Sequence, residues 1–523
     1  MPHARRLRFP LAVLVLLLGL LAVHAHAADQ HFDIDEFRVE GNTLLPADEI
    51  ESTVYEFLGP GKTRADVERA RAALDALYTS KGYPTVSAEI PRQSIDSGVI
   101  VLKVTERKVG RLRVTGSRYY ALSDIKNGAP SLAEGSVPNI NDVKRDIIAL
   151  NQLPDRSVTP VLKAGRAPDT VDVDLQVNDS LPLHGPLELN NRQSPDTTPL
   201  RLSGSLSYDN LWQRGDSASL YFQVAPQNPS DATVGSASYL FHVPDSRLSL
   251  LGSYLKSNSN VTTVGTTNVI GKGEIAGIRL LVPLTAEAGF VQTLSLGFDY
   301  KHFIQGVSLT GQSSNTPITY YPFAATYQGD WSSEHAQTDL TATLVVDMAE
   351  LGSDTATFDA NRYGASPSFA YVRGLLWHLH TLPHDVQIYL RAQGQASVVP
   401  LVPYEQFGLG GVDTVRGYLE SEWLGDYGGA LQTELRSPSL ADRIGAPVND
   451  LRLHVFGDVG TATINQPLPE QRTGYTLGSV GGGLRMRMFE HVNGELQDAV
   501  TLANGPSTKG GTNRVLFRLF GSF

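Results

Sequence analysis

From residue 186 to the C-terminus, apolar and polar residues alternate along the chain with a period of two. Leu294, Leu296 and Phe298, for example, are separated by small or polar residues. Each strand thereby gains one apolar and one polar face, as in a transmembrane β-barrel whose outer face meets lipid. Sixteen such segments between residues 186 and 523 predict an antiparallel barrel with an aqueous lumen. A soluble β-sandwich alternates in the same way, so other features must separate the two.

A second pattern, β-α-α-β-β, occurs twice ahead of the barrel and predicts two α+β domains in tandem. The first domain, residues 33–107, has strand patterns at 37–42, 86–91 and 99–106 and helical spacing over 46–57 and 65–81. The second, residues 108–179, has strand patterns at 112–116, 159–163 and 170–177 and helical spacing over 122–127 and 140–150.

The first 27 residues have the pattern of a secretory signal peptide. Three arginines precede the apolar run Leu11–Val23, and Ala25-His26-Ala27 has the small-x-small form of a cleavage site. The run is shorter than the roughly 20 residues of a membrane-spanning helix. Export favours the transmembrane barrel over the soluble sandwich. The chain contains no cysteine, so its stability must come from a closed architecture or large cores.

Charge limits the classes of partner. The whole chain has a formal net charge of −11, and removal of the three arginines with the signal peptide makes it more acidic. Such a surface argues against nucleic acid as a partner.

A glycine-rich stretch within residues 400–427 carries the most distinctive motif, Val415-Arg416-Gly417-Tyr418. Strand patterns flank it on both sides, so we predict a long inward-folding loop that presents the Arg416 guanidinium. An exposed turn with an incidental arginine is the simpler alternative.

Asp458 is the predicted partner of Arg416. In the strand 451–460, Leu453, Val455 and Val459 share one face, which places Asp458 on the polar face. A desolvated carboxylate is costly alone but tolerable opposite a guanidinium. We therefore expect this charge pair, rather than a large apolar core, to hold the loop. The alternative is an aspartate hydrated in a polar lumen.

Other polar side chains on the predicted inner face are candidates to line the pore. They are Arg452, His454, Arg485, Arg487, Glu495 and Gln497. The run Gly481-Gly482-Gly483 predicts a bulge or a kink beside them. His378, His380 and His384 are interpreted as part of an interfacial turn rather than a metal site, because Trp377 and Pro383 beside them suit such a turn.

These motifs resemble those of a known superfamily. The Val-Arg-Gly-Tyr loop, with the flanks EQFGLGG and GDYGGALQTELRSP and the strand FGDVG, resembles the outer-membrane insertase and translocase superfamily. The flanks look most like its two-partner secretion transporter (TpsB) branch. The segments VEGN and SKGY resemble POTRA domains, and LNQLPDRSVTPVLKAGRAPDTVDVDLQV looks like the second POTRA domain of TpsB transporters.

The resemblance implies a fold, a location and partners. It implies a 16-stranded outer-membrane barrel whose periplasmic POTRA domains receive an unfolded secreted exoprotein. It implies that Arg416 and Asp458 lock the loop, and that the barrel-assembly machinery reads the terminal Phe523 as an insertion signal. The plug helix usual in the family has room only in Ala28–Asp35, so we expect it to be missing.

We therefore predict a translocator that exports a partner protein across the outer membrane, surrounded by its lipid, without enzymatic activity, cofactor or metal. A barrel assembly factor is the main alternative, although its members commonly carry three or more POTRA domains. A passive porin is the third, and the two α+β domains argue against it.

Overall fold

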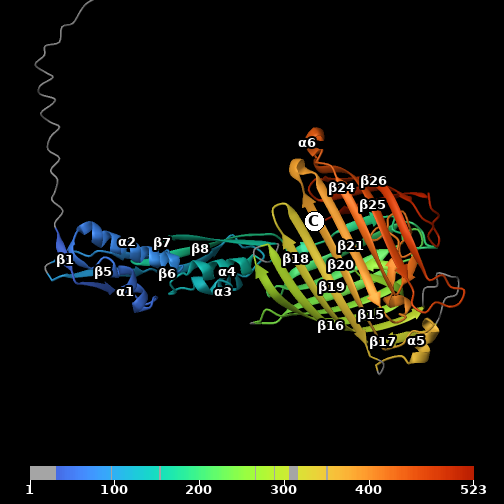
Figure 1. Ribbon diagram of the computed structural model, residues 1–523, viewed down its shortest axis with the longest axis horizontal. Coiled ribbons are helices and arrows are strands. Elements are labelled where there is room, and N and C mark those ends of the chain that lie inside the picture. The colour runs from blue at the N-terminus through green and yellow to red at the C-terminus, as the bar shows by residue number, and fades with distance from the viewer. Residues whose placement is uncertain are drawn as a thin grey trace, which may run out of the picture. The chain divides into compact units, whose positions relative to one another are not determined.

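The computed structural model describes residues 31–522 except 96, 152, 154, 245, 265–266, 288, 306–315 and 349–350, and it leaves the side chains of 260–270, 285–288 and 305 undescribed. The predicted signal peptide and Phe523 lie outside the described residues. The chain divides into two compact units, Met1–Leu181 and Pro182–Phe523 (Figure 1).

The first α+β domain packs two helices on a three-stranded sheet. Strand β5 (Val99–Glu106) is central, parallel to β2 (Glu36–Glu40) and antiparallel to β4 (Val86–Glu89). The helices are α1 (Ala47–Tyr55) and α2 (Arg64–Ser80), and a small ribbon joins β1 (Phe32–Ile34) to β3 (Gly59–Lys62).

Helix α2 forms where the sequence predicts it because it has both a buried apolar face and a capped N-terminus. Val67, Ala70 and Leu74 bury one face against the sheet. Thr63 and Asp66 form a capping box at its N-terminus. The hydrogen bonds from Thr63 lower the pKa of the Asp66 carboxyl to about 2.

The second α+β domain repeats this design. Its sheet has the order β6 (Lys108–Thr115), β8 (Thr170–Asp179), β7 (Arg156–Ala164), and its helices are α3 (Leu122–Asn127), η1 (Pro130–Leu132) and α4 (Ile140–Leu150). Asn139, which caps α4, also donates a hydrogen bond to the Lys81 carbonyl, and the Ile140 amide donates to the Gly82 carbonyl. The start of α4 is therefore fastened to the end of α2.

The second unit is a barrel built from one 18-stranded antiparallel sheet. Setting aside the two-residue β9 (Leu183–His184) and the three-residue β17 (Ile318–Tyr320) leaves sixteen described strands. They are β10 (Leu187–Asn190), β11 (Arg201–Leu211), β12 (Asp216–Val224), β13 (Thr233–His242), β14 (Ser249–Val264), β15 (Thr267–Glu287), β16 (Phe290–Gln305), β18 (Phe323–Ser332), β19 (Ala336–Asp347), β20 (Phe369–Thr381), β21 (Gln387–Ser397), β24 (Tyr427–Arg436), β25 (Val448–Thr463), β26 (Gly474–Met488), β27 (Val492–Thr501) and β28 (Asn513–Gly521).

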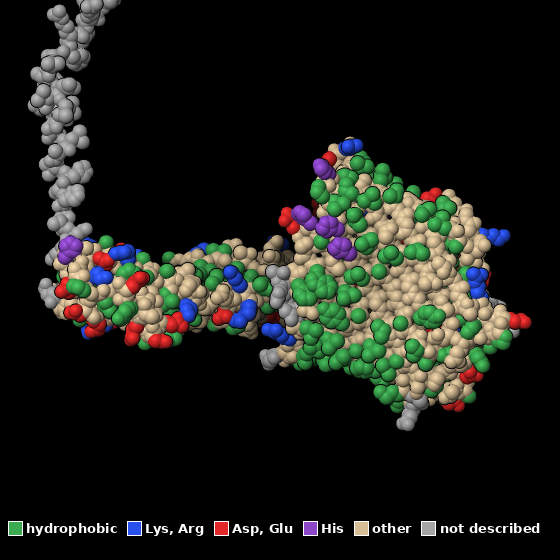
Figure 2. All heavy atoms as spheres, in the orientation of Figure 1, with side chains coloured by type: hydrophobic (Ala, Val, Ile, Leu, Met, Phe, Trp, Pro, Cys, Tyr) green, Lys and Arg blue, Asp and Glu red, His purple; other side chains and the backbone are tan. Residues whose placement is uncertain are grey.

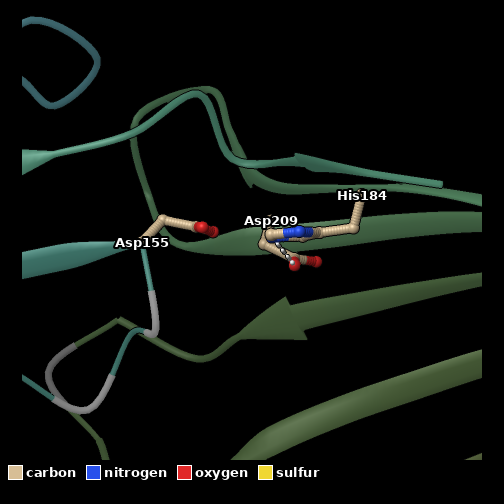
Figure 3. Close-up of side chains that lie close together, drawn as sticks. All are labelled: Asp155, His184 and Asp209. Carbon is tan, nitrogen blue, oxygen red and sulfur yellow. Dashed lines mark ion pairs between the residues drawn. The ribbon is translucent and has the colours of Figure 1, made fainter. Parts of the chain in front are cut away.

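Pairing of β10 with β28 closes the barrel, and this seam has four register pairs, against nine between β27 and β28. Short elements occupy some connections: α5 (Thr355–Asn361), η2 (Pro383–Asp385) and α6 (Ala441–Ile444). Strand β9 pairs with β11, where the His184 imidazole lies 3.5 Å from the Asp209 carboxylate (Figure 3).

The outer face of the barrel is apolar, as the alternation predicts. Leu220, Phe222, Val372, Leu453 and Val480 are among its exposed large side chains. Figure 2 shows hydrophobic side chains spread over an otherwise uncharged barrel surface, with charged side chains and histidines gathered toward its ends. An outer apolar face excludes the soluble sandwich, whose outer face would be polar. Among the described helices, we find none with the length and hydropathy needed to span a bilayer.

The bulge predicted at Gly481–Gly483 is wrong, because β26 keeps an unbroken register there with both β25 and β27. The glycines are needed because neighbouring atoms leave no room for a side chain, not because the strand is kinked. A Cβ on Gly481 would lie 2.4 Å from the Phe456 ring, and one on Gly483 would lie 2.9 Å from the His454 ring. The glycines let these two rings lie flat on the inner wall.

Candidate functional site: a loop anchored inside the barrel

The connection between β21 and β24 folds into the lumen. It contains η3 (Pro403–Glu405) and a hairpin of β22 (Phe407–Leu409) with β23 (Trp423–Gly425). Residues 401–411, 414–418 and 421–426 are buried, and their partners lie on the inner faces of several strands. The loop predicted over 400–427 is thus present and packed against the inner wall.

Arg416 and Asp458 form the pair that the sequence suggests. The Arg416 Nε and Nη2 atoms each donate to one oxygen of Asp458 at 2.7 Å, and the Arg416 backbone amide donates at 3.0 Å. Their side chains are 2% and 0% exposed. A bidentate guanidinium–carboxylate pair is the strong geometry for a site so removed from water.

Two further wall residues complete the coordination of Arg416. Its Nη1 atom donates to Glu434 at 2.5 Å and to Gln497 at 3.1 Å. The guanidinium carbon lies 3.6 Å from the centre of the Phe456 ring, a close cation–π contact. Arg416 therefore joins strands β24, β25 and β27.

Glu434 is the centre of a wider charge network. Besides Arg416, it accepts hydrogen bonds from Arg436 at 2.9 Å and Arg485 at 3.2 Å. Arg485 also lies 2.8 Å from Glu495. Three guanidinium groups thus share two carboxylates beside Asp458, and removal of any one leaves charges without full compensation.

A second set of charges holds the flanks of the loop tip. Asp413 pairs with Arg192 and, at 2.6 Å, with Arg391 of β21. Glu420 accepts from Arg192 Nε at 3.1 Å and from the Val412 amide at 3.1 Å. The tip is therefore clamped on both sides of Arg416.

The two stems of the loop are anchored by one buried acid each. Glu405 accepts hydrogen bonds at 2.6 Å from Lys301, Tyr320 and Tyr371. Asp426 accepts from Arg362 at 3.0 Å and from the Leu401 and Asn465 amides.

The expectation that a charge pair holds the loop without an apolar core is wrong. Leu409, Val415 and Trp423 pack with Ala462 and Leu477 of the wall in one buried cluster. The Tyr418 hydroxyl, in addition, donates to the Ala503 carbonyl at 2.7 Å. Burial of several large apolar side chains contributes several kcal/mol to the stability of the packed loop. The loop is therefore held by apolar packing as well as by charge pairs.

The other predicted inner-face residues occupy different places. Arg485, Glu495 and Gln497 join the network around Glu434 and Arg416, as described above. His454 is buried, and the centre of its ring lies 6.2 Å from the centre of the Phe456 ring in a stacked arrangement. Arg452 instead reaches the connections at the strand ends, donating to the Asp385 carboxylate at 2.8 Å and the Ser437 carbonyl at 3.1 Å. Arg487 is exposed, opposite Asn493 in register.

Sequence reasoning missed the roles of Glu405, Asp413, Asp426, Glu434 and Phe456. The sequence could have indicated Glu434 and Phe456, because the period-two pattern places both on the inner face of their strands. An aromatic ring such as Phe456 is unexpected among the polar residues of that face. The sequence indicates the three loop acids less clearly. They occur within or beside the quoted motifs, but the wall residues that they bind are distant in sequence.

A sixteen-stranded barrel with an apolar outer face, an arginine-anchored lumen loop and two preceding α+β domains defines a class, the outer-membrane transporters with periplasmic POTRA domains. A sequence model described as haemolysin secretion/activation protein ShlB/FhaC/HecB matches residues 169–486, and one described as POTRA domain, ShlB-type, matches residues 32–106. The chain belongs to the ShlB/FhaC/HecB family.

Individual relatives agree with this assignment. The outer membrane transporter CdiB of Dickeya dadantii is 21% identical over 440 residues, which cover 77% of this chain and 72% of that protein. The solved structure of CdiB from Escherichia coli has a TM-score of 0.65 at 20% identity and covers 96% of this chain and 92% of its own. BamA from Haemophilus ducreyi lacking POTRA domains 1–3 has a TM-score of 0.54 at 13% identity, covering 94% and 100%.

The predicted fold class and family are therefore confirmed. The chain is a two-partner secretion transporter of the outer membrane, with its POTRA domains in the periplasm. Membership of this family implies a secreted partner protein, which we call the cargo.

Proposed function

We propose that this transporter passes its cargo through the barrel as an unfolded chain, and that the contact of Arg416 with Asp458 sets the position of the loop during transport. The observation that supports this is the burial of a full charge at the loop tip against three wall strands. Such an arrangement costs stability unless its geometry is kept, so its presence at the tip of a loop inside the barrel suggests a functional loop position.

The POTRA pair is the proposed receiver of the cargo, by addition of a cargo strand to a sheet edge. Of the four edges in the two sheets, three are poorly suited. Strand β7 contains Pro160, which has no backbone N–H to donate. Every second residue of β2 is charged (Glu36, Arg38 and Glu40), which disfavours the addition of a strand. The start of β6 already forms backbone hydrogen bonds with Gly135 and Ser136.

Strand β4 is the edge that remains. A groove of about 880 Å³ runs beside it, with Val67, Ile90 and Ile100 among its apolar lining. The outward backbone groups of Ala88 are held by side chains of α2: its amide donates to Asp75 at 2.7 Å, and its carbonyl accepts from Arg71 at 3.4 Å. An incoming strand replaces these two side-chain bonds with main-chain ones.

Two further partners belong to this proposal. Outer-membrane lipid would cover the apolar outer face, and the barrel-assembly machinery would act on the C-terminal strand during biogenesis.

Comparison of cells with and without this chain tests the proposal. Mass spectrometry of culture supernatants and cell surfaces should show one or a few large proteins lost in its absence, while the amounts of other outer-membrane barrels stay the same. Cells producing Arg416→Ala should resemble cells lacking the chain. A broad loss of outer-membrane barrels would instead favour the assembly-factor alternative, for which the BamA likeness shows the fold alone.

A further inference from the structure

The segment that follows β10 touches both the barrel seam and the loop tip. The seam is short, with four register pairs between β10 and β28, as many as between β10 and β11. The loop tip is the part that carries Arg416. Residues 191–193 lie between the two and contact each of them.

On the seam side, the Asn191 side chain extends the ladder past the last backbone pair. Its amide nitrogen donates to the Val515 carbonyl at 2.8 Å, and its oxygen accepts from the Phe517 amide at 2.9 Å. The Asn191 side-chain amide thereby forms the two hydrogen bonds to β28 that the backbone of a further β10 residue would form. It covers the edge of β28 that the four-residue strand leaves without backbone partners.

On the loop side, Arg192 and Gln193 bind the tip. Arg192 pairs with both Asp413 and Glu420, and the Gln193 carbonyl accepts from the Glu420 amide at 2.9 Å. The Arg192 side chain is 23% exposed, so these pairs are shielded from solvent more than surface pairs are. Consecutive residues therefore fasten the seam and the loop.

We propose that residues 191–193 couple the loop to the seam, so that the seam is fully ordered only while Arg192 holds Asp413 and Glu420 of the loop tip. Withdrawal of Asp413 and Glu420 removes the partners of Arg192, which frees the neighbouring Asn191 from its position on β28. Coupling between two sites is reciprocal, so loosening of the seam also weakens the hold on the loop.

Hydrogen exchange of the full-length protein in lipid nanodiscs, without cargo, tests this coupling. The key variant is the loop-side double substitution Asp413→Asn with Glu420→Gln, which changes no residue of the seam. Amide exchange in residues 187–190 and 515–521 should rise about tenfold. Arg192→Ala should give a similar rise, and Arg192→Lys a smaller one.

Arg391→Ala is the matched control, because Arg391 binds the same Asp413 from β21 without touching residues 191–193. Its seam exchange should stay within about twofold of the wild type. Seam exchange that is unchanged in the loop-side double variant, or raised equally by Arg391→Ala, would overturn the proposal. Since no cargo is used, either result leaves the export function untouched.

Discussion

Arg416 can be buried in the barrel because the wall supplies acceptors for its backbone amide and for all three guanidinium nitrogens. Asp458 accepts from three of its N–H groups, Glu434 and Gln497 from another, and Phe456 faces the guanidinium plane. An arginine suits this position better than a lysine, since a planar fork can satisfy several acceptors and stack on a ring together.

The ring of Phe456 depends in turn on Gly481. A Cβ at position 481 would lie 2.1 Å from the Asp498 carbonyl and 2.4 Å from the Phe456 ring. Gly481→Ala should therefore displace Phe456 and lower the temperature at which the barrel unfolds, read from heat-modifiable gel mobility. Gly478→Ala, on the same strand with its nearest neighbour at 3.7 Å, should match the wild type. Equal unfolding temperatures for the two variants would count against this packing.

At the scale of the elements, the sequence predicted regular structure better than it predicted contacts. Helix α3 covers Leu122–Asn127 and α4 Ile140–Leu150, the spans that helical spacing indicated. Period-two alternation and a known motif were enough to pair Arg416 with Asp458. They could not pair Glu405 with Lys301 or Asp413 with Arg192, because those contacts depend on how a long loop crosses the barrel.

The edge of β4 gives a prediction for the POTRA pair. The Ala88 amide points to Asp75 and not to β5, so Ala88→Pro removes an outward donor without removing a ladder bond. Cargo secretion should fall several-fold, because an added strand loses a main-chain partner.

Asp75→Ala is the control for this edge, since it also removes a bond to Ala88 but leaves the amide free. Its secretion should equal or exceed that of the wild type. Normal secretion in Ala88→Pro would show that cargo does not use β4.

At the scale of the whole molecule, the barrel of this outer-membrane transporter holds a segment of its own chain packed against its inner wall. Loop stems, tip and wall form two buried clusters, one around Tyr404 and one around Leu409. The lumen therefore has to change, or to offer a path beside the loop, when cargo passes.

Removal of the loop tip tests how far the loop closes the lumen. The Ser421 amide donates to the Gly410 carbonyl at 3.1 Å, so residues 411–420 can be replaced by Gly-Gly while the β22–β23 hairpin remains. Conductance in planar bilayers should rise several-fold over that of the full chain. Unchanged conductance would mean that another part of the protein closes the pore.

A double-mutant cycle on Arg416 and Asp458, with secreted cargo as the readout, tests the central claim most directly. Truncating one partner of a buried pair typically costs ~3–5 kcal/mol, so each alanine variant should lower secretion. Arg416→Ala should be the more severe, since it also loses Glu434, Gln497 and Phe456. The double variant should equal Arg416→Ala, because both changes remove the same contact. Arg373→Ala, which removes an arginine bonded to Gln395 on the neighbouring strand, should secrete normally, and gel mobility should show a folded barrel in every variant. Additive losses in the double variant, or normal secretion from Arg416→Ala, would contradict the account.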